Sequence, residues 1–313
     1  MKISIIGSGA MGSLFGGRLA LAGQEVLLYD VFKEHVDAIN RNGLFIENAV
    51  SGNDGENLLV HPKASSDPKA VAGSDILIIF VKSTQTEAAA AAFKAYAKPG
   101  SIAITLQNGL GNEAILRKHF GDSGTAAGVT SQGATFLGPG KIRHAGNGPT
   151  HMAMADGDQS KLKDFASALS AAGFEIHVDK DVAGMVWSKL VVNVGINALT
   201  ALLNLKNGQL LDYEDVKAIM SDLVKEAAEV AKARGVKLDY EDPLETVYKV
   251  AAATGANYSS MLQDFQKKRQ SEIDFINGAI INEAKALGLK VPVNETMTRL
   301  VRSMDSIHAK GGA

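Results

Sequence analysis

The stretch MKISIIGSGAMG, residues 1–12, has the order of an apolar strand, a glycine-rich turn and the start of a helix. Gly7 ends the apolar run and allows a tight turn, Gly9 lets a pyrophosphate approach the backbone, and Gly12 lets the helix pack close to the strand. The helix expected from about Ala10 turns its free N–H groups and its positive dipole end towards an anion. A G-x-G-x-x-G pattern alone matches many loops, but its position between a strand and a helix predicts a dinucleotide-binding site.

An acidic residue at the end of the next strand indicates which dinucleotide binds. The strand expected over residues 25–29 is followed by Asp30, 18 positions after Gly12. A carboxylate at this spacing accepts a hydrogen bond from the ribose 2′-hydroxyl of NAD and repels the 2′-phosphate of NADP. Lys33 could still reach a phosphate from the start of the following helix. The sequence therefore favours NADH and leaves NADPH open.

Composition narrows the class of protein. The chain has 313 residues, 46% of them hydrophobic and 21% charged, and a formal net charge of −2, which is typical of a two-domain globular enzyme without affinity for nucleic acid or anionic membranes. It has no cysteine, which excludes disulfides, thiolate metal sites and cysteine catalysis. The seven histidines show no metal-ligand spacing, so no metal site is expected, and no G-x-S-x-G nucleophile motif occurs.

Two apolar segments are assigned to the fold rather than to a membrane. The N-terminal apolar run is too short for a signal peptide, which favours a cytoplasmic protein. The longest apolar stretch, residues 184–203, contains Lys189, Asn193 and Asn197, and a membrane-spanning helix rarely carries so many polar side chains. We therefore expect a buried helix of a soluble domain there.

Strand and helix patterns alternate in the first part of the chain, which predicts a Rossmann-type, doubly wound parallel α/β sheet. Strands are expected at residues 2–6, 25–29, 44–47, 58–60, 76–81, 101–106 and 175–178, and helices at residues 10–22, 33–42, 84–97 and 159–172. The turn between the third and fourth strands is expected at Asn53-Asp54-Gly55. The glycine-rich stretch 126–155 is predicted to form antiparallel strands that close the sheet.

The pattern changes to helical periodicity after about Lys180. Long helices are expected at residues 182–205, 214–234, 244–254 and 259–287. We therefore predict a dinucleotide-binding domain at residues 1–180 and an all-α substrate and catalytic domain at residues 181–313.

The expected helix 182–205 carries a polar strip. Lys189, Asn193 and Asn197 are spaced four apart, so they project from one face of a helix whose other residues are apolar nearly all round. A face exposed to solvent would carry more Glu, Arg and Lys, so the strip is interpreted as the wall of a cleft.

Other polar residues occupy positions where a ligand can bind. Lys82 and Asn108 follow two of the expected parallel strands, at the sheet edge where open α/β sheets bind ligands. The expected helix 259–287 carries Ser260 near its start and Glu272 further along, and Asn257 precedes Ser260 by three positions. By itself, Glu272 is typical of a surface carboxylate.

These motifs together resemble the ketopantoate reductase family (2-dehydropantoate 2-reductases) over essentially the whole chain. The resemblance rests on GSGAMG at residues 7–12, Lys82, QNGLG at 107–111, WSKLVVNVGINALTA at 187–201, NYSSMLQD at 257–264 and EIDFING at 272–278. The order of these motifs, their spacing and their distribution over the two expected domains all agree with the family.

The resemblance implies hydride transfer from a reduced nicotinamide to a 2-keto acid, ketopantoate first of all, in the cleft between the domains. Lys189 matches the catalytic lysine, whose ammonium polarises the ketone and protonates the alkoxide, and Glu272 and Asn108 match the residues that orient it. The implied cofactor contacts are Gly7, Ser8, Gly9, Ala10, Met11, Gly12, Asp30, Lys82, Asn108, Ala134 and Glu272. The implied substrate contacts are Asn108, Asn193, Asn197, Asn207, Asn257 and Ser260.

Two alternatives remain at this stage. The family's NADPH-using members usually carry an arginine where this chain has Asp30, and residues 30–43 resemble the NAD-dependent D-2-hydroxyacid dehydrogenase branch, which reduces other bulky 2-keto acids. A dinucleotide-binding regulator without turnover would also explain the glycine turn, but it leaves Lys189, its asparagines and Glu272 unexplained. The expected partner is a small 2-keto acid, and a homodimer is possible.

Overall fold

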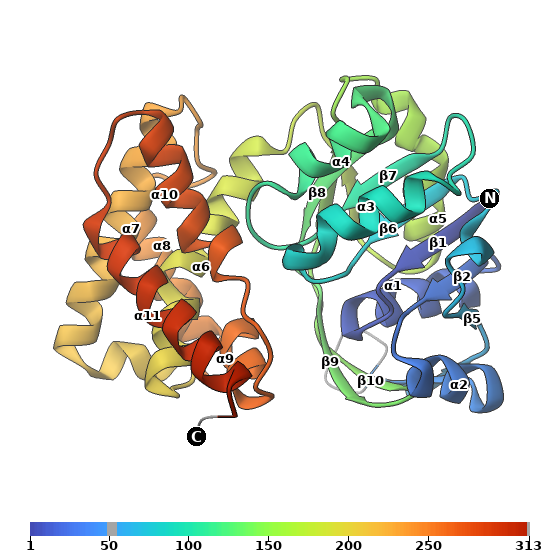
Figure 1. The fold of residues 1–313 in the computed structure, drawn as a ribbon, viewed down its shortest axis with the longest axis horizontal. Coiled ribbons are helices and arrows are strands. Elements are labelled where there is room, and N and C mark those ends of the chain that lie inside the picture. Colours follow the sequence, from blue (N-terminus) through green and yellow to red (C-terminus); the bar gives the residue numbers. More distant parts are fainter. Residues whose placement is uncertain (49–54, 312–313) are drawn as a thin grey trace. The chain divides into compact units, whose positions relative to one another are not determined.

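The computed structural model describes residues 1–48 and 55–311, and the chain forms two compact units (Figure 1). The α/β unit consists of Met1–Gln107 and Asn112–Val182. The helical unit consists of Asn108–Gly111 and the chain from Ala183 onward. Two residues of the predicted turn, Asn53 and Asp54, lie outside the described residues.

The α/β unit is built on an eight-stranded sheet with the order β12-β11-β8-β7-β6-β1-β2-β5. Its strands are β1 (Lys2–Ile6), β2 (Glu25–Tyr29), β5 (Lys63–Ser65), β6 (Ile76–Ile79), β7 (Ile102–Thr105), β8 (Thr125–Thr130), β11 (Thr150–Met154) and β12 (Ile176–Val178). β1 is parallel to both β2 and β6, with Ile5 opposite Leu28 and Ile78. The strand order reverses direction beside β1, and this is the kind of switch point at which such sheets bind ligands.

Helices cover both faces of this sheet, so its strands are apolar on both sides. Ile3 and Ile5 of β1 pack with α1 (Ala10–Leu21) and α5 (Lys163–Ala171), whereas Ile6 packs with α3 (Thr86–Lys94) and α4 (Asn112–Phe120). Figure 1 shows α3 and α4 on the near face of the sheet. A further helix, α2 (Lys33–Asn42), contacts β5. The prediction of a doubly wound sheet is therefore confirmed. Its physical reason is that strands with apolar residues on both sides need helices on both faces of the sheet to keep them from water.

A second, smaller sheet has the order β4-β3-β10-β9. Its strands are β3 (Leu44–Glu47), β4 (Leu58–Val60), β9 (Gly133–Gly138) and β10 (Lys141–Gly146). The prediction that the stretch 126–155 closes the main sheet is therefore wrong for β9 and β10, although β8 and β11 do pair antiparallel in that sheet. β9 and β10 form a hairpin that turns at Gly138 (φ +157°) and Gly140 (φ +70°), and β10 pairs with β3 in parallel. Such a pairing between distant segments leaves no local pattern in the sequence.

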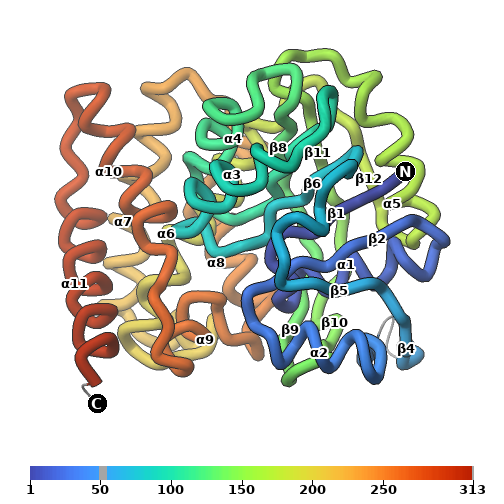
Figure 2. Tube along the Cα trace, turned by 45° about the vertical axis from the view of Figure 1, so that its right-hand side comes forward, coloured from blue at the N-terminus to red at the C-terminus, as the bar shows by residue number. Residues whose placement is uncertain are grey.

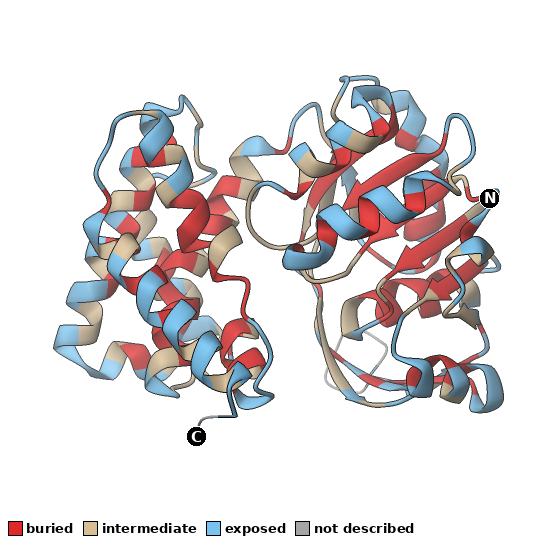
Figure 3. Cartoon of the chain, in the orientation of Figure 1, coloured by how far each residue is buried: buried red, intermediate tan, exposed pale blue. Residues whose placement is uncertain are grey.

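The helical unit packs around the apolar helix α6 (Figures 2 and 3). Its helices are α6 (Ala183–Leu203), α7 (Glu214–Ala233), α8 (Pro243–Ala253), α9 (Ser260–Gln266), α10 (Asn277–Ala286) and α11 (Pro292–Ala309). Of the helices described, only α6 is long and apolar enough to cross a membrane, and 67% of its most apolar stretch is buried inside the structure. It is therefore the core helix that the sequence predicted.

The predicted single helix 259–287 is wrong. α9 ends at Gln266 and is followed by Lys268 in the left-handed region (φ +50°). The N–H groups of Lys268 and Arg269 donate to the carbonyls of Phe265 (2.9 Å) and Asp264 (2.8 Å), the pattern of a Schellman cap. This cap ends the helix without a glycine, so the usual stop signal is absent from the sequence.

Several elements were not predicted from the sequence. These are β5, α4 and α11, together with short 3₁₀ helices at Pro68–Val71, Ser83–Gln85, Asp122–Gly124, Gln159–Leu162, Gly208–Asp212 and Ile273–Phe275 (η6). α11 begins with Pro292 and carries a buried apolar face, so its start signal and periodicity could have identified it.

Candidate functional site

The glycine turn is held tightly against the ends of three strands. Gly7 has φ +93°, and a Cβ on it would lie 2.6 Å from the backbone nitrogen of Val81, just beyond β6. The N–H groups of Gly7 and Ser8 donate to the carbonyl of Tyr29 in β2, at 2.9 and 3.1 Å. Only glycine combines this backbone angle with this close approach, so the turn is fixed at the switch point of the sheet.

The start of α1 faces open space beside this turn. A Cβ on Gly12 would collide with the carbonyl of Gly7 and with Ile5, so Gly12 permits the close packing that the sequence predicted. Gly9 is the N-cap of α1, and apart from Gly9 itself and its neighbours in the chain no described atom lies within 4 Å of the position that its Cβ would take. The N-cap has no side-chain hydrogen bond, and the first turn of α1 carries no acidic residue. These N–H groups can therefore receive an anion.

Asp30 lies beside the glycine turn at the end of β2. Its carboxylate accepts hydrogen bonds from the Phe32 N–H (3.0 Å) and, over a longer distance, from Ser8 Oγ (3.4 Å). Ser66 Oγ donates to the Asp30 carbonyl (2.8 Å). The backbone of Asp30 is thus fixed, and Ser8 Oγ links its side chain to the glycine turn.

Lys82 and Ala134 also lie on elements next to the turn. Lys82 has an extended backbone and precedes the 3₁₀ helix Ser83–Gln85, immediately after the backbone that contacts Gly7. Ala134 is in β9, opposite His144 of β10, and β9 packs against α1.

A buried polar network, not predicted from the sequence, fixes the ends of β6 and β7. Gln107 Nε2 donates to the Val81 carbonyl (2.6 Å) and to Thr86 Oγ1 (2.9 Å). Thr86 Oγ1 donates to Asn112 Oδ1 (2.9 Å), and Asn112 Nδ2 donates to Ser83 Oγ (3.1 Å). These bonds hold the segments that contain Lys82 and Asn108. The sequence did offer one indication of this network, because polar residues directly neighbour both Lys82 and Asn108.

Asn108–Gly111 packs with the helical unit, although the neighbouring strand belongs to the α/β unit. Gly109 has φ +87°, and a Cβ on it would collide with the carbonyl of Phe275. The Leu110 N–H donates to the same carbonyl (2.9 Å), and the Phe275 N–H donates to the carbonyl of Glu272 (3.0 Å). Two of the predicted catalytic residues, Asn108 and Glu272, are therefore on segments joined by hydrogen bonds.

Glu272 is not on a helix face, contrary to the prediction. It is the N-cap of η6, in the connection between α9 and α10, and it is 9% exposed. The neighbouring Ser271 is held by Asp305 of α11, which accepts hydrogen bonds from the Ser271 hydroxyl (2.7 Å) and N–H (3.1 Å). Glu272 is therefore a buried carboxylate, whereas its sequence context alone is typical of a surface carboxylate.

The polar strip of α6 is partly buried, and its interpretation as the wall of a cleft stays a prediction. Asn197 is 5% exposed, and Lys189 and Asn193 are half-buried. Burial lowers the pKa of Lys189 from its usual value near 10.5 to about 8. A lysine with this pKa can exchange a proton near neutral pH, which an exposed lysine rarely does.

Hydrogen bonds connect the predicted substrate residues of the helical unit. Thr200 Oγ1 donates to the Asn197 carbonyl (2.8 Å) and contacts Ser259 Oγ (2.6 Å), directly before Ser260 at the start of α9. These contacts link the end of the polar strip to Ser260.

Asn207 and Asn257 are joined in the same way. The Asn207 N–H donates to the Asn257 carbonyl (3.1 Å), and Asn207 Nδ2 donates to Thr254 Oγ1 (2.9 Å). Asn207 Oδ1 is buried and has no hydrogen-bond partner among the described residues. A buried amide oxygen without a donor is costly, so this atom is suited to accept a hydrogen bond from a ligand hydroxyl.

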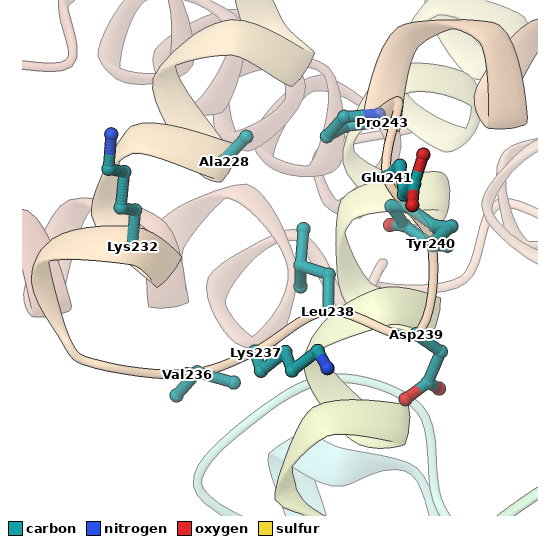
Figure 4. Close-up of a pocket in the computed structure, with 9 residues that line it drawn as sticks. All are labelled: Ala228, Lys232, Val236, Lys237, Leu238, Asp239, Tyr240, Glu241 and Pro243. Atoms are coloured by element: carbon teal, nitrogen blue, oxygen red, sulfur yellow. The ribbon is translucent and has the colours of Figure 1, made fainter.

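The segment between α7 and α8 holds the turn of α6 that precedes Lys189. The Asp239 N–H donates to Ser188 Oγ and the Tyr240 hydroxyl donates to the Ser188 carbonyl, both at 2.8 Å. Burial raises the pKa of Tyr240, so its hydroxyl stays protonated as a donor. A cavity of about 540 Å³ lies beside this segment. Figure 4 shows the residues that line it: Ala228, Lys232, Val236, Lys237, Leu238, Asp239, Tyr240, Glu241 and Pro243. None of the predicted site residues lines it.

We expect Tyr240→Phe to lower the free energy of unfolding of the helical unit by about 1 kcal/mol, because it removes one partly buried hydrogen bond. Urea unfolding can be followed by the fluorescence of Trp187, the single tryptophan, which is buried next to Ser188. Lys237→Ala is the matched control, since Lys237 is an exposed residue of the same cavity wall and its loss should change stability by less than about 0.5 kcal/mol. Equal effects of the two variants would contradict the role given to Tyr240.

Comparison with known proteins gives matches over both units. Residues 3–157 match the family described as "Ketopantoate reductase PanE/ApbA", and residues 181–305 match "Ketopantoate reductase PanE/ApbA C terminal". The 2-dehydropantoate 2-reductase of Halobacterium salinarum is 36% identical over 303 residues, which are 96% of this chain and 98% of that protein.

Solved structures agree with this assignment. A PanE/ApbA family ketopantoate reductase from Ralstonia eutropha JMP134 is 36% identical, with a TM-score of 0.91 over 99% of this chain and 100% of that one. A D-mandelate dehydrogenase in a ternary structure with NADH and anilino(oxo)acetate is 30% identical, with a TM-score of 0.89 over 99% of this chain and 100% of that one. The polar strip of α6, the glycine turn at β1 and these full-length matches together show that the chain belongs to the ketopantoate reductase family.

Proposed function

We propose that this protein reduces 2-dehydropantoate to D-pantoate with a nicotinamide dinucleotide, and that Lys189 is the proton donor. The observation that supports this most directly is a partly buried lysine with a lowered pKa on the same helix face as Asn193 and Asn197. A cytoplasmic location is part of this proposal. The burial of α6, the apolar helix that could otherwise have spanned a membrane, is compatible with this location.

Lys189 supplies the acid that the reduction needs. The bound reduced nicotinamide supplies a hydride to the keto carbon. The ammonium of Lys189 donates a hydrogen bond to the keto oxygen and transfers its proton as the carbonyl becomes an alcohol. With a pKa of about 8 it is mostly protonated at pH 7, yet it is a stronger acid than an ordinary lysine.

The remaining candidate residues hold the reactants. Glu272 and Asn108, whose chain segments are joined by the backbone hydrogen bonds of Phe275, orient the lysine and the nicotinamide. Amides and a hydroxyl suit the carboxylate and hydroxyl groups of the substrate. The residues that supply them are Asn193, Asn197, Asn207, Asn257 and Ser260.

We propose that the dinucleotide lies on the glycine turn with its pyrophosphate at the start of α1, and that it is NADH. Asp30 supports this choice, because its carboxylate lies beside the turn and would repel a 2′-phosphate. The D-mandelate dehydrogenase that resembles this chain was solved with NADH, which supports the same choice. Lys82 and Ala134 flank this position, and Lys82 contributes positive charge near the phosphates.

A D-2-hydroxyacid dehydrogenase is the second candidate, favoured by the 30% identity to the D-mandelate dehydrogenase. It uses the same chemistry on a different 2-keto acid. The unpartnered Asn207 Oδ1 favours a substrate with a hydroxyl beyond its keto acid, which 2-dehydropantoate has and a 2-keto acid with an aromatic side chain lacks.

The assay that tests this follows the absorbance of NADH and of NADPH with 2-dehydropantoate and, in parallel, with phenylglyoxylate. We expect NADH oxidation with 2-dehydropantoate at a kcat/KM at least about 10-fold above that for phenylglyoxylate, because one buried acceptor is left unpaired by the second acid. The reverse preference would establish the second candidate. Oxidation of neither cofactor with either acid would remove the enzyme proposal in favour of a dinucleotide-binding regulator.

A further inference from the structure

His35, a residue of α2 for which the sequence gave no role, is bonded directly to the glycine turn. It is 1% exposed, and its ring nitrogens contact three different segments. Nδ1 accepts a hydrogen bond from the Gly140 N–H in the β9–β10 hairpin (2.9 Å). Nε2 lies 2.8 Å from the Ser8 carbonyl and 3.1 Å from Ser13 Oγ of α1.

These contacts define the protonation state of His35. A backbone N–H can only donate, so Nδ1 carries no proton while it is bonded to Gly140. The proton of the neutral imidazole is then on Nε2, which donates it to the Ser8 carbonyl. Ser13 Oγ donates a second hydrogen bond to this carbonyl (2.7 Å). The Ser8 carbonyl is therefore held inward by two side chains.

The orientation of the Ser8 carbonyl also determines the orientation of the Gly9 N–H at the proposed phosphate site. The Ser8–Gly9 peptide is trans, as no described peptide bond is cis, so its N–H points opposite to its C=O. With the Ser8 carbonyl held towards His35 and Ser13, the Gly9 N–H points away from them. This N–H belongs to the residue around whose Cβ position the structure leaves open space.

We infer that His35 is a positioning residue: it orients the Gly9 N–H for the dinucleotide pyrophosphate and ties the glycine turn to the β9–β10 hairpin. This inference rests on the proposed pyrophosphate position at the glycine turn. His35 does not touch the dinucleotide itself, and it acts by fixing one peptide plane in the orientation that binding requires.

The same geometry makes binding depend on pH. The aromatic rings of Phe32 and Phe136 pack around His35, and burial lowers its pKa below 6.5, although the Ser8 carbonyl and the nearby Asp30 carboxylate favour the charged form. At neutral pH the ring is therefore uncharged. When the pH falls through its pKa, Nδ1 gains a proton and faces the Gly140 N–H donor to donor. Two donors cannot stay at this distance in a buried site, so the ring shifts, its Nε2 bond to the Ser8 carbonyl is lost together with the link to the hairpin, and affinity for the dinucleotide falls.

Two isosteric variants test the inference by NADH titration of the full-length protein. Glutamine places an amide near Nε2 and can still donate to the Ser8 carbonyl, whereas asparagine places its amide near Nδ1 and reaches only Gly140. At pH 7.5 we expect His35→Asn to raise the Kd for NADH by about 10-fold or more, the range for losing one buried hydrogen bond, and His35→Gln to raise it by less than about 3-fold.

The dependence of the Kd for NADH on pH and the value of kcat are two further measurements. A role of His35 in stability alone would not change them in the way described here. As the pH is lowered from 7.5 through the pKa of His35, the Kd of the wild type should rise, and that of His35→Gln should rise less. At saturating NADH, kcat should be unchanged in His35→Gln. His177→Asn, at a half-exposed histidine of β12, is the control and should bind NADH like the wild type across this range.

Each outcome separates the inference from the proposed function. A Cβ on Gly9 would enter the open space, so Gly9→Val should abolish NADH binding if the pyrophosphate lies there. If Gly9→Val loses binding while His35→Asn binds NADH as tightly as the wild type, the role of His35 is wrong and the phosphate site stands. If Gly9→Val binds normally, the proposed phosphate site itself is wrong. If His35→Asn does not fold, equal pH dependence in His35→Gln and the wild type overturns the inference.

Discussion

Lys189→Met is expected to lower kcat for keto-acid reduction by about 1000-fold, the middle of the range for loss of a positioned general acid. Methionine keeps the length and the apolar contacts of the side chain but cannot polarise or protonate the keto oxygen. The Kd for NADH should change by less than about 2-fold, because the dinucleotide is proposed to bind on the glycine turn of the α/β unit. Steady-state kinetics and NADH titration of the same preparation measure the two quantities.

Stability provides the control for this variant. The lowered pKa of Lys189 means that the fold disfavours the charged form, so removing the ammonium relieves a desolvation cost below pH 8. Lys189→Met should therefore unfold at a temperature no lower than the wild type. A kcat within 10-fold of the wild type would remove Lys189 from its role.

The same pKa predicts how the rate depends on pH. Only the protonated lysine can donate, so kcat/KM for reduction should be level below pH 8 and should fall tenfold per unit above it. In the oxidation direction the neutral lysine accepts the proton, so the rate should rise through the same pH. A reduction rate that stays level to pH 10 would show that the proton comes from another group.

Asp30→Ala is expected to raise the ratio of kcat/KM for NADPH over that for NADH by about 100-fold. The estimate combines the loss of a charge-assisted bond to the ribose with the removal of a repulsion between two anions, each worth on the order of 1–3 kcal/mol in a partly solvated site. Parallel rates with the two cofactors give the ratio directly.

Asp37→Ala is the matched control for this substitution. Asp37 is an exposed carboxylate of α2, so the variant loses the same charge from the same region without touching the end of β2. Its cofactor ratio should stay within about 2-fold of the wild type, as expected for a screened surface charge. A wild-type protein that prefers NADPH would refute the interpretation of Asp30.

Much of the α/β unit could be predicted from its sequence, because its elements carry local signals. The bounds of β1, β2, β3, β4 and α2 follow from apolar runs, alternation and turn residues. The spacing of Gly7, Gly9 and Gly12 predicts three different backbone requirements. The structure shows the tight turn at Gly7 and the close packing at Gly12, whereas the approach of a pyrophosphate to Gly9 stays a prediction. α6 was evident from its length and apolar composition.

Less of the candidate site could be predicted from the sequence, since its properties depend on contacts between residues that are distant in the chain. The sequence around Glu272 does not tell whether this residue lies on a helix or in a connection between helices. The helix α9 ends because Lys268 adopts a left-handed backbone conformation, and a lysine, unlike a glycine, does not indicate such an end in the sequence. The sequence predicts the ordinary pKa for Lys189, while burial lowers it to about 8.

By itself, the sequence determined most strands of the α/β unit, the glycine turn, the acidic residue after β2 and the polar strip of α6, because these depend on residues within a few turns of one another. Only the tertiary structure decided that Asn108–Gly111 packs against Phe275, that the β9–β10 hairpin joins β3, and that His35 holds the Ser8 carbonyl. Each of these joins segments far apart in the chain. Their energies come from burial and from hydrogen bonds that form only when the chain has folded, so no local pattern records them.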